Sequence, residues 1–244
     1  MAQGVLLFKG MKVAFLPGDL VISCDPTGGF ESKAILSTAY NVIPVWLRVA
    51  RDNAMQAKRA SDRIAQEWST DDVRNRELLV GELECCLQVF VSCGIALDAL
   101  YDQLRPFARI TAADIQAWKE NGTGRAKQIA EVLRRVFNLN GLIFKQFRHN
   151  LTEIIKYRDL AVHPSLELKQ ACPRPDLPVG VDWKFAAYRS QNSEACLSST
   201  ISMFGYLYEH PCENQSVTTS MEDVFAALRE LGVVTLKEEH PTGA

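Results

Sequence analysis

The spacing of apolar residues changes about thirty residues into the chain. Residues 4–24 hold short runs of Val, Leu, Ile and Phe, broken by Lys-Gly and Pro-Gly-Asp turns, which is typical of two or three short strands. From residue 30 onward, apolar positions recur at the three- and four-residue spacing of helices. The pattern predicts a mainly α fold: an up-and-down helical bundle at 30–210, a β-like N-terminal arm at 1–29, and a C-terminal helix and tail at 211–244.

Individual residues mark where the first helices begin and end. We expect a helical stretch over 30–68, with Pro44 kinking or breaking it early. The stretch Ser-Thr-Asp-Asp at 69–72 provides an N-cap candidate and acids in the first turn of a second helix. That helix runs to about Leu104 and is the most apolar segment of the chain. It is therefore predicted to lie at the centre of the bundle.

A later helix, predicted from Leu142 to about Val162, carries a charge on its apolar stripe. At about 100° per residue, the stripe occupies an arc of about 120°, and its members are Ile143, Phe147, Leu151, Ile154 and Ile155. Arg158 falls near the middle of this arc. An unpaired buried guanidinium is costly, so Arg158 must pair with an acid, line a cleft or face a partner subunit.

The residues after Arg158 add a titratable group. In an ideal helix, His163 would lie about 140° around from Arg158. Pro164 disfavours helical backbone at the residue before it, which frees the imidazole of His163 to turn back toward the guanidinium. A fixed guanidinium beside a group that titrates near neutral pH suits phosphate chemistry, with Arg holding the oxygens and His transferring protons.

This segment, Tyr157 to Ser165, resembles the Rx4–6H motif of the HEPN superfamily (higher eukaryotes and prokaryotes nucleotide-binding domains). Members are all-α bundles, and many are metal-independent ribonucleases of toxin–antitoxin, abortive-infection or CRISPR-linked systems. The resemblance implies that Arg158 and His163 form a catalytic pair and that Asp159 is the polar residue after the arginine. It also implies that two copies of the motif face one RNA strand at a homodimer interface.

The same resemblance implies a reaction, and this chain departs from the family pattern at one position. RNA would be cleaved by attack of its 2′-hydroxyl, leaving a cyclic phosphate. The position of Asp159 is often Asn in the family. The charge of an aspartate would draw in Arg158 or raise the pKa of His163.

Basic residues are concentrated in the same part of the chain. Residues 124–158 carry eight Lys and Arg against two Glu, a net charge of +6, which leaves −8 for the remainder of a chain whose total is −2. A basic strip beside a phosphate site suits RNA binding, and Lys145, Arg148 and Lys156 are the candidate contacts to the RNA backbone. Two helices with solvated basic faces would give the same count.

Composition narrows the remaining possibilities. The net charge of −2 excludes a uniformly basic coat. Nothing resembles a signal peptide or the roughly 18 uncharged apolar residues of a membrane span, so we expect a cytoplasmic protein without membrane contact. Cys85, Cys86 and Cys93 lie in one apolar helical run without metal-ligand spacing and are expected to be core thiols. No motif indicates a metal or another cofactor.

Three interpretations remain open. The first is a HEPN-like metal-independent endoribonuclease, for which the resemblance implies an antitoxin or another protein as a candidate partner. The second is a non-catalytic HEPN-type module that binds RNA, nucleotide or a protein, with the arm adding to a sheet. The third is a structural helical protein in which Arg158 pairs with a buried carboxylate and His163 only ends a helix.

Overall fold

The computed structural model describes residues 5–24, 29–163 and 167–234 of the chain. It divides into two compact units, Met1–Val42 and Ile43–Ala244. The described residues of the first unit form strands and turns, whereas the second unit is mainly helical.

The first unit is a two-stranded antiparallel ribbon. Its outer pair joins β1 (Met11–Ala14) to β4 (Ser37–Tyr40), with Met11 opposite Tyr40. Its inner pair joins β2 (Leu20–Cys24) to β3 (Phe30–Ala34), with Leu20 opposite Ala34. The helix predicted from residue 30 is therefore wrong over β3 and β4. Pairing with strands earlier in the chain overrides the weak local preference of these residues.

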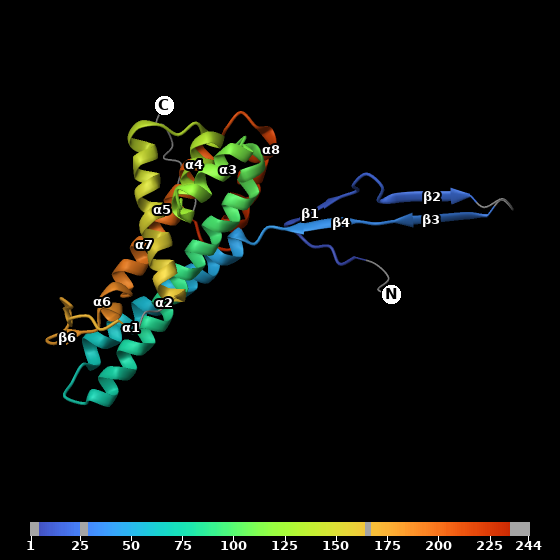
Figure 1. Ribbon diagram of the computed structural model, residues 1–244. Helices are drawn as coiled ribbons and strands as arrows, with labels where there is room; N and C mark the ends of the chain where they lie inside the picture. Colours follow the sequence, from blue (N-terminus) through green and yellow to red (C-terminus); the bar gives the residue numbers. More distant parts are fainter. Residues whose placement is uncertain (1–4, 25–28, 164–166, 235–244) are drawn as a thin grey trace, which may run out of the picture. The chain divides into compact units, whose positions relative to one another are not determined.

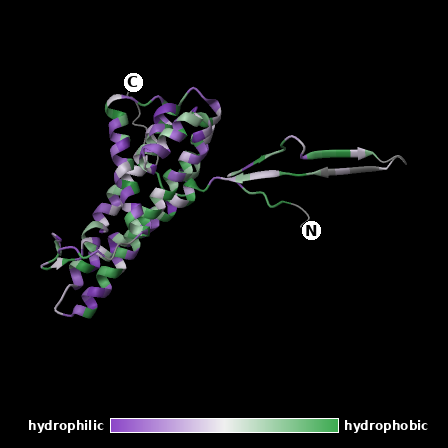
Figure 2. Ribbon diagram, viewed as in Figure 1, coloured by the Kyte–Doolittle hydropathy of each residue, from purple (hydrophilic) through white to green (hydrophobic). Residues whose placement is uncertain are grey.

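Over the part of the ribbon that the structure describes, no side chain is buried in a core. Leu20, Val21 and Ile22 are 61%, 49% and 64% exposed, and β2 appears as a strongly hydrophobic strand in Figure 2. Its shape depends on backbone pairing and on turns, including Gly18, whose φ of +90° is easily reached only by glycine. An isolated two-stranded ribbon is at best marginally stable in water.

The second unit is a bundle of helices (Figure 1). The described helices are α1 (Ile43–Glu67), α2 (Asp72–Leu104), the short η1 (Arg105–Phe107), α3 (Ala112–Glu120), α4 (Arg125–Phe137), α5 (Gly141–Val162), α6 (Trp183–Ala187), α7 (Ser190–Glu209) and α8 (Gln215–Glu230). Two short strands, β5 (Cys172–Pro173) and β6 (Gly180–Val181), pair in the segment between α5 and α6. The prediction of a mainly α fold is confirmed.

The first two helices form a hairpin, and their ends follow from local chemistry. Pro44 is the second residue of α1, where its missing N–H costs nothing. It therefore starts the helix rather than kinking it. Asp71 caps α2 by accepting hydrogen bonds from the N–H groups of Val73 and Arg74, at 3.0 and 3.2 Å, which confirms the predicted N-cap.

Helix α2 is the central helix, as its apolar sequence predicts. It packs against α1, α4, α5 and α7, and Cys86, Cys93 and Leu97 on it are fully buried. Burial raises the pKa of Cys86 to about 12, so this thiol stays protonated. By length and composition alone α2 would also pass as a membrane-spanning helix, although 44% of its apolar window is buried within the fold.

A buried ion pair fastens the segment after α5 to the middle of α2. Arg174 Nη1 lies 2.7 Å from Glu82 Oε2, and each side chain is only 1% exposed. The backbone N–H of Ser190 donates to Glu82 Oε1 at 2.9 Å. Arg174 also pairs with Asp176 at 2.8 Å. Breaking a buried pair of this kind by removing one partner typically costs about 3–5 kcal/mol.

Candidate functional site

Helix α5 presents its apolar stripe to the bundle, and Arg158 lies on that stripe. Phe147, Leu151, Ile154 and Ile155 are buried, while Ile143, nearer the start of the helix, is 41% exposed. The side chain of Arg158 is 15% exposed. The prediction that a guanidinium occupies an otherwise apolar face is therefore confirmed.

Two carboxylates hold this guanidinium. Nη1 of Arg158 donates to Asp98 Oδ2 of α2. Nε of Arg158 donates to Asp159 Oδ1 at 2.9 Å, and Nη2 lies 2.9 Å from the same oxygen. All three nitrogens of the guanidinium thus face a carboxylate, and Asp159 does draw in its neighbour as the sequence suggested. Asp98 is partly buried, with 26% of its side chain exposed, whereas Asp159 is 50% exposed.

A glycine makes room for the stem of Arg158. A Cβ placed on Gly94 of α2 would lie 2.7 Å from Cδ and 2.8 Å from Cγ of Arg158, closer than carbon atoms can approach. The arginine therefore crosses α2 where α2 has no side chain. This close approach fixes both the path of the side chain and the position of its charged end beside Asp98.

A second arginine completes the cluster from another helix. Nε of Arg125, the first residue of α4, donates to Asp98 Oδ1 at 2.6 Å, and its guanidinium lies 3.8 Å from the centre of the Tyr101 ring. Burial works against the charge of Arg125, but the hydrogen bond and charge of Asp98 outweigh it and raise its pKa. Asp98 thus bridges two arginines and joins α2, α4 and α5.

His163 is the exposed residue that follows the last turn of α5. Its φ of −121° and ψ of 68° are not helical, and its backbone N–H donates to Asp159 O at 2.8 Å. The predicted end of the helix at Val162 is therefore confirmed. Within the described residues, no hydrogen bond joins the exposed imidazole to Arg158 or to any other group. Asp159 contacts both residues in different ways: its carboxylate accepts from the guanidinium of Arg158, and its carbonyl accepts from the backbone N–H of His163.

A second helix ends in the same way. His210 follows α7 with φ −122° and ψ 71°, and it too precedes a proline. Its imidazole stacks on Tyr206, with ring centres 4.0 Å apart, and its Nδ1 lies 3.0 Å from Tyr206 O. Gly205 takes the place, five residues earlier, that Arg158 has before His163.

Many of the basic residues of this strip form ion pairs with acids of their own helix or of a neighbouring helix. Arg135 lies 2.8 Å from Asp114 of α3, Arg134 lies 2.7 Å from Glu131, and Arg125 is held by Asp98. Lys156 is 3.6 Å from Glu153 in an exposed pair. Lys145 and Arg148 are exposed, and neither forms an ion pair with a described residue. These two remain the candidate contacts for a phosphate backbone.

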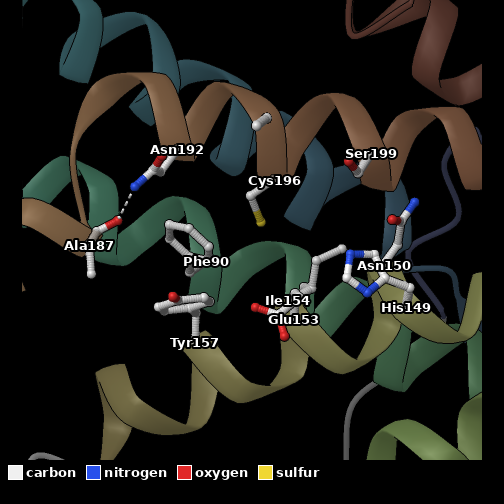
Figure 3. Close-up of a pocket in the computed structure, with 11 residues that line it drawn as sticks. Phe90, His149, Asn150, Glu153, Ile154, Tyr157, Ala187, Asn192, Cys196 and Ser199 are labelled. Carbon is white, nitrogen blue, oxygen red and sulfur yellow. Dashed lines mark hydrogen bonds between the residues drawn. The ribbon is translucent and has the colours of Figure 1, made fainter. Parts of the chain in front are cut away.

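A cleft of about 290 Å³ lies between α5 and α7. Figure 3 shows Phe90 and Tyr157 at one end of it, His149, Asn150 and Ser199 at the other, and Glu153 between them. Cys196 points into the cleft from α7. A hydrogen bond with Cys93 and burial raise the pKa of Cys196 well above its ordinary value. No sequence motif indicated this cleft, because its residues come from four helices, α2, α5, α6 and α7.

The described residues contain no group of three His, Cys, Asp or Glu that could hold a metal ion. Asp98 and Gly94 were not among the site residues predicted from the sequence, although each left a signal in it. An isolated glycine and an isolated aspartate both interrupt the most apolar helix of the chain. A glycine inside such a helix often marks a close packing contact, and a half-buried acid requires a cationic partner.

Comparison of the chain with protein-family models, with curated proteins and with solved structures finds no match.

Proposed function

We propose that this protein is a HEPN-like, metal-independent endoribonuclease that acts as a homodimer. Arg158 binds the scissile phosphate, and His163 transfers protons during attack of the 2′-hydroxyl. That attack forms a bond from the 2′-oxygen to phosphorus and breaks the bond from phosphorus to the 5′-oxygen. A cyclic phosphate and a free 5′-hydroxyl are the products.

The observation that carries this proposal is the way Arg158 is built into the fold. Because Gly94 has no side chain, the aliphatic part of Arg158 can cross α2 at this point. Asp98 accepts a hydrogen bond from one nitrogen of the guanidinium and holds it in place. A charge held so firmly close to the surface is pre-organised for an anion, because little conformational freedom is left to lose on binding.

His163 supports the proposal by its exposure. The helix ends one residue before it, and its imidazole is exposed to solvent. An exposed imidazole is free to reach an RNA strand lying over the end of α5. Proton transfer requires a base and an acid, and a homodimer supplies two copies of the motif.

The exposed half of the cluster explains how a phosphate gains access. The Asp159 carboxylate is 50% exposed, and an exposed ion pair contributes only about 0–1 kcal/mol. A phosphate can therefore displace Asp159 from Nε and Nη2 while Asp98 continues to hold Nη1. Asp159 acts in this scheme as a weak, replaceable occupant of the phosphate site.

The decisive experiment measures cleavage of a fluorescent single-stranded RNA in the presence of EDTA. The wild-type protein is expected to cleave it and to leave a cyclic phosphate. His163→Ala is expected to lower the rate by about 10²- to 10⁴-fold, the usual contribution of an acid–base group. Circular dichroism checks that the fold is intact.

The matched control is His210→Ala, which removes a histidine from a helix end of the same geometry. It is expected to leave the rate unchanged. Equal loss in both variants, or cleavage that depends on added metal, would refute the proposal.

The second candidate is a non-catalytic HEPN-type module that binds RNA. The observation favouring it is that every nitrogen of Arg158 already faces a carboxylate. Such a module would retain RNA in a salt-sensitive manner through Lys145 and Arg148, without producing fragments. Binding and cleavage assays on the same RNA separate the two candidates.

A further inference from the structure

We propose that the cleft between α5 and α7 binds a small organic cation: a protonated amine with an aromatic or apolar body. The ammonium group would lie on Glu153, and the body would lie against Phe90 and Tyr157. This inference is independent of the nuclease proposal, because the Arg158–Asp98 cluster does not line the cleft.

The cleft has the size and lining of a ligand site. Its volume of about 290 Å³ is close to the lower end of the range of about 300–1,000 Å³ for small-molecule pockets. An apolar floor with a few polar groups around it is the usual composition of such sites. Here the floor includes Phe90, Ile154 and Cys196, and the raised pKa of Cys196 keeps that floor uncharged.

The charge of the lining selects a cation. Among the described residues that line the cleft, Glu153 is the only one that carries a formal charge with histidine neutral, and none of them is Lys or Arg. An anion would therefore meet a carboxylate, whereas no described Lys or Arg of the lining offers it a positive charge. An ammonium group would gain a charge-assisted hydrogen bond.

The aromatic end favours the same ligand. The Phe90 and Tyr157 rings are 5.6 Å apart and inclined at 47°, so an aromatic body can pack against them while its ammonium approaches Glu153. A cation near the face of a tyrosine ring is further stabilised by the ring quadrupole.

The ammonium group of Lys156 already lies near both Glu153 and Tyr157. The ammonium of Lys156 lies 3.6 Å from Glu153 Oε2 and 5.1 Å from the centre of the Tyr157 ring. The Lys156 side chain is 54% exposed, so it is held weakly. Lys156 does not line the cleft. It shows that this carboxylate and this ring accept an ammonium group, and it should compete with an external amine.

The far end of the cleft offers further polar contacts. Figure 3 shows His149, Asn150 and Ser199 on that side. Asn192 is less available, because its amide nitrogen donates to Ala187 O at 2.9 Å. An amine that also carries a hydroxyl group on its body would have partners at both ends.

The test uses three probes of one shape on the full-length protein: phenethylamine, neutral 2-phenylethanol and anionic phenylacetate. Binding is followed by chemical-shift changes and by calorimetry. Phenethylamine is expected to bind at least about tenfold more tightly than either of the others. Equal binding of the amine and the alcohol, or tighter binding of phenylacetate, would overturn the proposal.

Two variants locate the ammonium group. Glu153→Gln is expected to weaken phenethylamine binding about tenfold or more and to leave 2-phenylethanol within about twofold. Lys156→Met is expected to tighten phenethylamine binding, because it removes the internal competitor. The control is Glu194→Gln, a change to an exposed carboxylate of α7 that does not line the cleft. Loss of amine binding in the control, or unchanged binding in Glu153→Gln, would show that Glu153 is not the anchor.

Discussion

The C-terminal ends of α5 and α7 share one backbone design and differ in what surrounds it. Both helices end at a histidine that precedes a proline, and the φ and ψ angles of His163 and His210 agree within 3°. Each histidine N–H donates to the carbonyl four residues earlier, at 2.8 and 3.0 Å. A histidine followed by proline therefore ends a helix at two places in this chain, and this sequence does not by itself indicate a functional site.

The two helix ends differ in their side chains. The imidazole of His210 is stacked on Tyr206, and the residue five positions before it is Gly205. Both histidines are exposed, but His163 has Arg158 five positions before it, held by carboxylates from two helices. The difference between the two helix ends therefore lies in the arginine and in the carboxylates that orient it, and the histidine alone does not distinguish them.

The largest expected effect comes from removing the guanidinium from the α5 end. Arg158→Met keeps most of the stem that packs over Gly94 but no longer binds phosphate. RNA cleavage is expected to fall at least about 100-fold, the usual effect of deleting a donor to a reacting phosphoryl or acyl group. If Arg158→Met is less stable but cleaves RNA normally, the arginine has only a structural role and the two helix ends are equivalent.

The next effect concerns the packing beneath Arg158. Gly94→Ala forces the arginine stem away from α2 and is expected to lower the free energy of unfolding by about 1–3 kcal/mol. The matched change Gly81→Ala lies on the same helix, where nothing stands within 4 Å of the added Cβ. It is expected to raise the free energy of unfolding by up to about 1 kcal/mol, because alanine favours helix. Urea denaturation of both variants measures the difference.

The two prolines provide a more direct comparison of the helix ends. Pro164→Ala allows the helix to continue through His163, which would turn the imidazole about 140° from Arg158. Cleavage is expected to fall about tenfold. Pro211→Ala allows the same extension at α7 and is expected to leave cleavage unchanged. A similar effect of both changes would indicate a general loss of stability, which thermal unfolding would reveal.

The smallest expected effect is an increase in the rate of RNA cleavage. Asp159→Asn removes the exposed charge that occupies Nε and Nη2 of Arg158, leaving them available to phosphate. Cleavage is expected to rise several-fold, with a change in stability below about 1 kcal/mol. Most of this increase should come from a lower Michaelis constant, because the freed nitrogens bind the phosphate of the substrate. A fall in activity would show that the Asp159 charge is needed to orient the pair.

The sequence predicted most accurately those features that depend on neighbouring residues. The Asp71 cap, the end of α5 at Val162 and the apolar stripe with Arg158 on it all follow from periodicity and local chemistry. The strands β3 and β4 were missed, because their partners β1 and β2 lie earlier in the chain and local preferences in this stretch are weak.

The partner of Arg158 was missed for a related reason. Asp98 is sixty residues earlier in the chain, and no local pattern connects it to Arg158. The sequence required only that the arginine be paired, line a cleft or face another subunit. The packing of α2 on α5 selects the first of these within one chain. The cleft between α5 and α7 was equally inaccessible to sequence reasoning, since its floor and rim come from separate helices.

The close approach of Gly94 to Arg158 has a consequence for how this chain can diverge. Any residue other than glycine at position 94 collides with a long side chain at position 158, and a short side chain at 158 would leave a void above Gly94. The two positions are therefore expected to change together among homologous sequences. A lineage that loses the arginine should soon lose the glycine as well, and such paired losses would mark descendants that have abandoned whatever task the guanidinium performs.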